Sequence, residues 1–209
     1  MIKKNTLLIL LLVVFAYSCK TNDPEIKYKY NTNPSFTWGY TEFYGAYYSD
    51  FKIPNNVVSL SLFSDSLDMN NQNELVGLGQ YLFLEDIFIS ANDTILPAGE
   101  YKIANNGKPF TFYKGEEFKV DDLKYNIGSF ILYIEKNKLF TVQRFISGGS
   151  FKVINQGDNQ QIICDFTLSD STKIKGNFNT ELPYFDQSLK KTSGEPRQHL
   201  IVKGWDQAK

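Results

Sequence analysis

The stretch "KIKGNFNTEL" (residues 173–182) shows a regular alternation between two kinds of side chain. Every second position belongs to a mostly apolar set: Ile174, Gly176, Phe178, Thr180 and Leu182. The positions between them carry charged or amide side chains: Lys173, Lys175, Asn177 and Asn179. Successive side chains of a β-strand point to opposite faces of the sheet. The stretch is therefore predicted to be a strand with one face on a core and the other in water, as is typical of antiparallel sheets.

The same period of two recurs from residue 36 onward, and turn residues separate the segments at short intervals. The clearest hairpin signal is "EKNK" (135–138), which lies between two apolar runs. Helical periodicity is hard to find, apart from a short stretch within residues 65–79. Many short strands joined by turns form closed barrels or two-sheet sandwiches. We therefore expect an all-β fold, an antiparallel meander barrel of about eight to ten strands, with a β-sandwich as the alternative.

The N-terminus has the pattern of an export signal. Lys3 and Lys4 precede the apolar run "LLILLLVVFA" (7–16). This run is too short to cross a bilayer, because a spanning helix needs about 20 residues. The pattern therefore indicates a secretory signal peptide rather than a transmembrane helix. The small residues Ala16 and Ser18 lie close to the end of this signal, and Cys19 follows at once.

The stretch "FAYSC" (15–19) resembles a bacterial lipobox, whose cysteine is lipid-modified at its thiol and becomes the first residue of the mature chain. The alternative is an ordinary secretory signal with a cysteine nearby. The resemblance implies a lipoprotein signal peptide at residues 1–18 and lipid attachment at Cys19. The polar segment that follows, to residue 34, is expected to be a flexible tether. Its first charged residues resemble the export signal that Bacteroidota place after the lipidated cysteine of surface lipoproteins.

The second cysteine supports this interpretation of the first. Cys164 alternates with apolar neighbours in "IICDFTL" (162–168), so it is expected to be a small buried thiol. If Cys19 is acylated, Cys164 has no partner for a disulfide. A nucleophilic thiol would need a nearby histidine or other cationic group. The single histidine, His199, lies in a polar C-terminal stretch.

Composition excludes several functional classes. Removal of residues 1–18 would reduce the basic residues from 22 to 20 against 23 acidic ones, a formal net charge of −3. Without a long basic run, nucleic acid is not an expected partner. A single histidine provides neither a good base for a His-based triad nor a site with two histidine ligands. We expect no catalytic site, no metal and no cofactor, and therefore no enzyme.

The C-terminal half carries a family resemblance. The segments "GSFKVI" (149–154), "IICDFTL" (162–168) and "IKGNF" (174–178), with "LPAGEY" (96–101) upstream, look like those of small calycin-like (lipocalin-like) β-barrel lipoproteins of Bacteroidota. The resemblance covers residues 80–182. It implies an outer-membrane lipoprotein of the cell envelope, periplasmic or surface-exposed, whose barrel holds a small ligand. The expected boundaries are a barrel domain at residues 35–185 and a loose C-terminal tail at residues 186–209.

An aromatic-rich first strand is the candidate binding site. Trp38, Tyr40 and Tyr44 share one face of this strand. Aromatic rings stack on sugars and enclose apolar ligands, so a small apolar or sugar-like ligand is expected. The alternative for the three residues is a role in the barrel core. The alternative for the protein is a surface accessory lipoprotein that binds a glycan or partner protein through a β-sandwich face.

Carboxylates offer a third alternative, a hydrolase. Glu85 and Asp86 are adjacent on a predicted strand, so they should point to opposite faces and form no dyad. An exposed position at the rim of the sheet is the simpler interpretation, since a buried acid would be paired or functional.

Three short segments resemble the Asp-Ser/Thr-apolar signal for O-glycosylation in Bacteroidota: "DSL" (65–67), "DTI" (93–95) and "DST" (170–172). All three lie in predicted turns or loops. The resemblance implies Ser66, Thr94 and Ser171 as attachment sites. Asp-Ser is also ordinary turn chemistry, which is the alternative.

Overall fold

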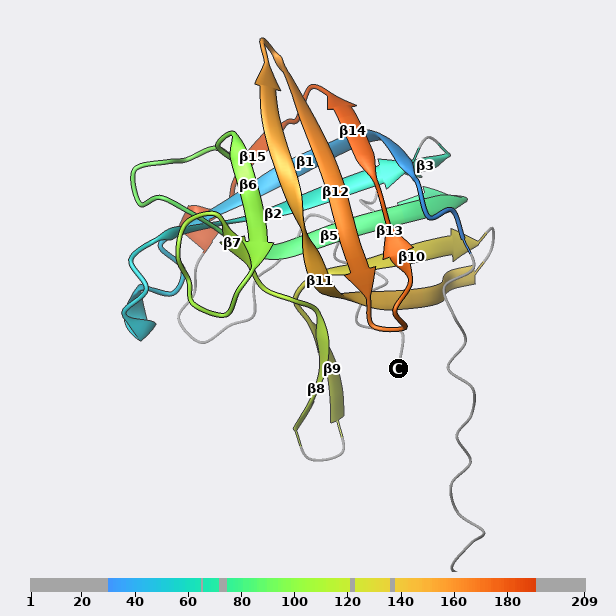
Figure 1. Ribbon diagram of the computed structural model, residues 1–209, viewed down its shortest axis with the longest axis horizontal. Coiled ribbons are helices and arrows are strands. Elements are labelled where there is room, and N and C mark those ends of the chain that lie inside the picture. The colour runs from blue at the N-terminus through green and yellow to red at the C-terminus, as the bar shows by residue number, and fades with distance from the viewer. Residues whose placement is uncertain (1–29, 65, 72–74, 121–122, 136–137, 191–209) are drawn as a thin grey trace, which may run out of the picture.

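The computed structural model describes residues 30–64, 66–71, 75–120, 123–135 and 138–190 (Figure 1). The described residues are all-β, which confirms that prediction, and the helical segments among them are the short 3-10 turns η1 (Ser49–Phe51) and η2 (Ser188–Lys190). The strands are β1 (Ser35–Gly45), β2 (Asn56–Ser64), β3 (Leu67–Met69), β4 (Leu75–Gly77), β5 (Gly79–Ile89), β6 (Gly99–Ile103), β7 (Thr111–Phe112), β8 (Glu116–Val120), β9 (Leu123–Ile127), β10 (Phe130–Glu135), β11 (Lys138–Gln156), β12 (Asn159–Leu168), β13 (Lys173–Ile174), β14 (Asn177–Thr180) and β15 (Tyr184–Asp186).

One large sheet has pairings that return to their starting point. From β1 the hydrogen-bonded order runs through β2, β5, β10, β11, β12 and β14, and β14 pairs with β1 again. A second connection between β11 and β5 passes through β6 and β7. The pairs β3–β4 and β8–β9 are separate hairpins. The arrangement is ring-like, with β8–β9 projecting below the main sheet in Figure 1.

The sheet is mixed, which differs from the purely antiparallel meander expected. β1 runs parallel to β14 and to β15, and β6 runs parallel to β7. A period of two reports only that one face of a strand is buried, and parallel and antiparallel neighbours satisfy it equally well. Residues 65–79 contain the short stretch of helical periodicity noted in the sequence. In the structure they contribute the strands β3 and β4 and the start of β5.

In residues 173–182, the predicted buried and exposed faces are both observed. Ile174, Gly176 and Phe178 are buried, whereas Lys173 and Lys175 are exposed. The stretch is divided between β13 and β14, and both pair with β12.

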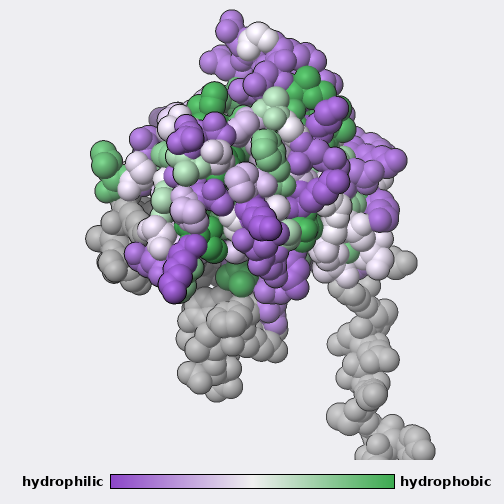
Figure 2. All heavy atoms as spheres, turned by 60° about the vertical axis from the view of Figure 1, so that its left-hand side comes forward, coloured by the Kyte–Doolittle hydropathy of each residue, from purple (hydrophilic) through white to green (hydrophobic). Residues whose placement is uncertain are grey.

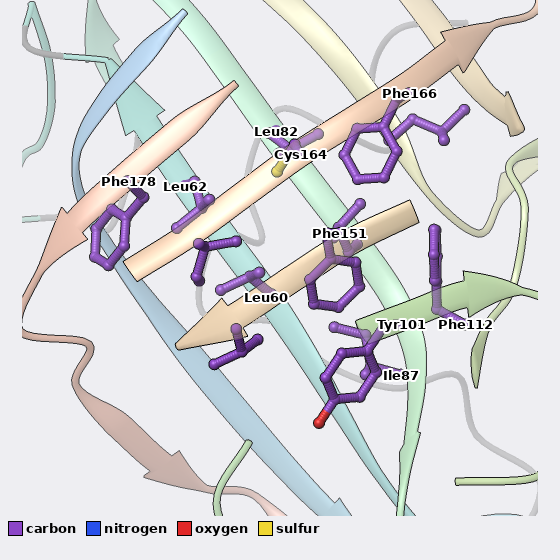
Figure 3. Close-up of a cluster of buried hydrophobic side chains, with 14 of the residues drawn as sticks. Leu60, Leu62, Leu82, Ile87, Tyr101, Phe112, Phe151, Cys164, Phe166 and Phe178 are labelled. Carbon is purple, nitrogen blue, oxygen red and sulfur yellow. The ribbon is translucent and has the colours of Figure 1, made fainter. Parts of the chain in front are cut away.

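Apolar side chains fill the interior of the ring (Figure 3). The rings of Tyr101 and Phe151 stack at a centroid distance of 4.7 Å, and Phe112 lies 5.3 Å from Phe151. The labelled members of this core come from strands all around the ring: Leu60, Leu62, Leu82, Ile87, Tyr101, Phe112, Phe151, Cys164, Phe166 and Phe178. We call the whole cluster the inner core; its other members are Phe36, Phe43, Val58, Leu84, Ile89, Leu96, Ile131, Ile146, Val153, Ile162, Leu168 and Ile174.

Cys164 belongs to the inner core, and burial raises the pKa of its thiol well above the ordinary value. A raised pKa leaves less thiolate at any given pH, and the thiolate is the reactive form. In a Cys19→Ala variant, Cys164 should therefore resist Ellman's reagent at pH 8 and react once the protein is unfolded in guanidinium. Rapid reaction of the folded variant would contradict the described position of Cys164.

The chain enters the sheet through residues 30–34, the described part of the predicted tether. The ring of Tyr30 stacks on Tyr133 of β10 at 3.7 Å. The backbone carbonyls of Thr32 and Pro34 accept hydrogen bonds from the amides of Lys175 and Asn177. The predicted signal peptide (1–18), Cys19, tether residues 20–29 and tail residues 191–209 lie outside the described residues. Within the described ranges, no helix is long and apolar enough to cross a membrane.

Candidate ligand-binding face

The strands β1, β2 and β5 carry a second set of side chains that points away from the inner core. We call this set the outward face. Its register is fixed by the ladders, because Trp38 lies opposite Phe63, Tyr40 opposite Ser61, and Glu42 opposite Ser59. On the other side of β2, Tyr81 of β5 lies opposite Phe63. All three predicted binding residues, Trp38, Tyr40 and Tyr44, lie on this face.

One end of the outward face is a stack of aromatic rings. The indole of Trp38 lies 3.8 Å from the ring of Phe63, which in turn stacks on Tyr81 at 4.7 Å. Trp38 Nε1 donates a 2.7 Å hydrogen bond to the carbonyl of Leu67, which begins β3. The β3–β4 hairpin therefore fixes the orientation of the indole.

The middle of the outward face is polar although it is buried. We call Tyr40, Glu42, Ser59, Ser61 and Tyr81 the polar band. Ser59 Oγ donates to Glu42 Oε2 at 3.3 Å, and the hydroxyls of Ser61 and Tyr81 share a 3.2 Å hydrogen bond. Glu42 has no exposed surface, and Ser59 and Ser61 are 1% exposed.

Tyr40 is the member of the polar band with unused hydrogen-bonding capacity. Its side chain is 4% exposed, and its hydroxyl lies near Ser61 but has no hydrogen-bond partner within 3.5 Å among the described residues. Burial and, to a smaller extent, the nearby Glu42 carboxylate raise the pKa of Tyr40 well above the ordinary tyrosine value, and the Ser61 hydroxyl offsets only part of this. The phenol therefore stays protonated near neutral pH and can donate a hydrogen bond.

A bulge brings two further carboxylates off the inner core. Leu84 of β5 pairs with Leu60 of β2, and Ile87 pairs with Val58, and all four belong to the inner core. Between these pairs, β2 has one residue, Ser59, whereas β5 has two. These residues are Glu85 and Asp86, and Asp86 has a φ of 53°.

The expectation that Glu85 and Asp86 point to opposite faces is wrong, because the bulge interrupts the alternation. The rim interpretation is also wrong for Asp86, which is only 5% exposed. The Tyr48 hydroxyl donates a 2.8 Å hydrogen bond to Asp86 Oδ2, and Glu85 Oε2 accepts one from the amide of Gly128.

The other end of the outward face is a group of aromatic rings around the β1–β2 loop. Tyr44 contacts Tyr47, which meets Tyr48 nearly at a right angle with centroids 5.0 Å apart. Tyr48 contacts Phe51 of η1, a side chain that is 75% exposed. Tyr48 also contacts Tyr113, whose pKa is raised by burial and by Asp86. Sequence reasoning missed this loop, although "YYSDF" (47–51) places aromatic residues beside turn residues.

The structure therefore separates the predicted binding residues. Trp38 and Tyr40 both contact Phe63, whereas Tyr44 lies with Tyr47 at the opposite end of the face. None of the three belongs to the inner core, but Tyr40 is part of a second buried hydrophobic cluster with Phe63 and Tyr81, and Trp38 packs against this cluster. Figure 2 shows the side of the molecule that carries η1, where hydrophobic residues form separate patches among hydrophilic ones.

The hydroxyl-bearing residues Ser66, Thr94 and Ser171 are exposed in turns or loops. Asp170, beside Ser171, is 7% exposed and accepts hydrogen bonds from Arg144 Nε at 3.2 Å and from the amide of Thr172. This aspartate therefore stabilises the β12–β13 turn. O-glycosylation at the three positions stays a prediction.

Comparison with known proteins identifies no relative: no family model, curated protein or solved structure matches this chain. Across the described part of the chain, no group of three or more His, Cys, Asp or Glu side chains is placed to hold a metal ion.

Proposed function

We propose that this chain is a lipid-anchored, non-enzymatic protein of the cell envelope that binds a small sugar-like ligand on its outward face. The anchor is Cys19 in the outer membrane, with the domain in the periplasm or at the cell surface. The observation that carries the ligand proposal is the arrangement of the outward face. Aromatic rings lie at both of its ends, and hydroxyl and carboxylate groups lie between them.

We also propose that the ring of strands is a calycin-like barrel, as the family resemblance implies. The pairing of β14 with β1 supports closure of the sheet. Aromatic and aliphatic side chains of the inner core occupy the interior of this barrel. We therefore infer that the ligand binds on the outside.

The chemistry of the face favours a sugar over a purely apolar ligand. A pyranose presents C–H groups that pack on aromatic rings and hydroxyls that both donate and accept hydrogen bonds. Glu42 offers acceptor oxygens, and the Tyr40 hydroxyl offers a donor. An apolar ligand would leave the buried Tyr40 hydroxyl without a hydrogen-bond partner, which is costly.

The second candidate is a surface accessory lipoprotein that docks a glycan or a partner protein. The exposed side chains of Phe51, Tyr184 and Phe185 favour it. Binding of this kind would involve the exposed side chains and would not require the polar band.

The proposal is tested by calorimetric titration of the protein with a panel of free mono- and oligosaccharides. At least one sugar should bind, and Glu42→Gln should weaken that binding by about 10-fold or more, because a hydrogen bond to a charged group is lost. The matched control is Glu100→Gln, which removes an exposed carboxylate paired with Lys102 on β6 and should change nothing. Thermal unfolding checks that both variants are folded. Failure of every sugar to bind, or equal affinities in both variants, would contradict the proposal.

A further inference from the structure

A short segment after β14 lies along the edge of β1 beside the polar band. We call residues 183–187, which include β15, the strap. Tyr184 pairs with Thr41, Phe185 with Glu42, and Asp186 with Phe43, all in parallel register. The Thr41 amide donates to the Pro183 carbonyl, and the Gln187 amide donates to the Phe43 carbonyl, both at 2.8 Å.

The strap touches Tyr40, whose hydroxyl has no hydrogen-bond partner within 3.5 Å among the described residues. The ring of Phe185 meets Tyr40 edge to face, with centroids 5.6 Å apart and planes at 87°. Phe185 itself is 41% exposed, whereas Tyr40 is 4% exposed. The strap therefore forms part of the boundary between the polar band and solvent.

The β15 part of the strap buries less side-chain surface than the central strands of the sheet, although Gln187 at its end is 6% exposed. All three side chains of β15 are exposed, so little apolar surface holds the strand in place. Parallel pairing is slightly less stable per residue than antiparallel pairing. On this edge of β1 the other described partner is β14, which pairs only at Ser35 and Phe36. The edge from Thr41 to Phe43 would therefore become open if the strap left it.

We propose that the strap is a gate, which detaches from β1 to admit the sugar-like ligand to Tyr40 and Glu42 and then closes again. This inference rests on the proposed function for the identity of the ligand. The opening itself can be measured without any sugar. In the closed state the ring of Phe185 covers part of Tyr40, and the open state would expose Tyr40 to solvent.

Acetylation of Tyr40 by N-acetylimidazole, followed by mass spectrometry, measures the opening. Phe185→Ala should increase the rate at Tyr40 by about 2- to 10-fold, because an aromatic contact of the closed state is lost. The matched control is Leu189→Ala, an apolar residue just after the strap whose side chain is 97% exposed. It should leave the rate at Tyr40 nearly unchanged. Equal rates in the wild type and Phe185→Ala would overturn the gate.

A disulfide that fixes the strap separates the two proposals. Thr41 and Tyr184 are direct neighbours across the β1–β15 ladder, so Thr41→Cys with Tyr184→Cys should form a bond in a Cys19→Ala background. The oxidised protein should show slow Tyr40 acetylation and weak binding of the sugars that bind the wild type, and dithiothreitol should restore both. Acetylation or sugar binding unaffected by oxidation would overturn the gate. Redox-controlled acetylation without any sugar binding would support the gate and contradict the proposed function.

Discussion

Replacing Phe151 with alanine should reduce the free energy of unfolding by about 3–5 kcal/mol, the cost of a large cavity in a packed core. Phe151 is 1% exposed and lies on β11 between Tyr101 of β6 and Cys164 of β12. Its ring stacks on Tyr101 of β6 and contacts Phe112 of β7 and Phe166 of β12. The substitution therefore removes contacts that join separate parts of the ring.

Urea denaturation followed by far-UV circular dichroism measures this loss. The matched control is Phe51→Ala, the same chemical change at a side chain that is 75% exposed. It should change stability by less than about 0.5 kcal/mol. If both variants were destabilised to the same small extent, the interior of the ring would not be packed as described.

Replacing Cys19 with alanine should move the protein from the membrane fraction to the soluble fraction. Each buried methylene of an acyl chain contributes about 0.8 kcal/mol to membrane binding, and stable anchoring needs more than one lipid signal. The variant without an acceptor thiol would have no lipid chains and should lose this attachment.

Cell fractionation with labelled fatty acid checks this prediction. The control is Cys164→Ala, which removes a buried thiol of the inner core and should leave the protein labelled and membrane-bound. A Cys19→Ala protein that still carried the label and stayed with the membrane would show that the lipobox interpretation is wrong.

Local patterns were sufficient for the fold class and not for the strand order. The alternation at residues 173–182 correctly placed Ile174 and Phe178 on a buried face, and the same logic placed Cys164 in a core. The parallel pairing of β14 and β15 with β1 was not predictable, because it depends on contacts between residues far apart in the chain.

The outward face was predictable only in part. Period two correctly grouped Trp38 with Tyr40, but residues 39–44 of β1 are all buried, so alternation could not say which face points into the ring. The bulge at Asp86 was hidden because its position depends on how β5 pairs with β2. Tyr47 and Tyr48 were missed because loop residues have no periodicity to read.

We propose that a sugar-like ligand binds the outward face and not the interior of the ring. The most direct measurement is solution NMR of the protein with the tightest-binding sugar of the panel, recording NOEs between sugar protons and aromatic side chains. We expect NOEs from the sugar to the rings of Trp38 and Tyr40. NOEs to Tyr101 or Phe151 in the inner core, with none to Trp38 or Tyr40, would contradict it.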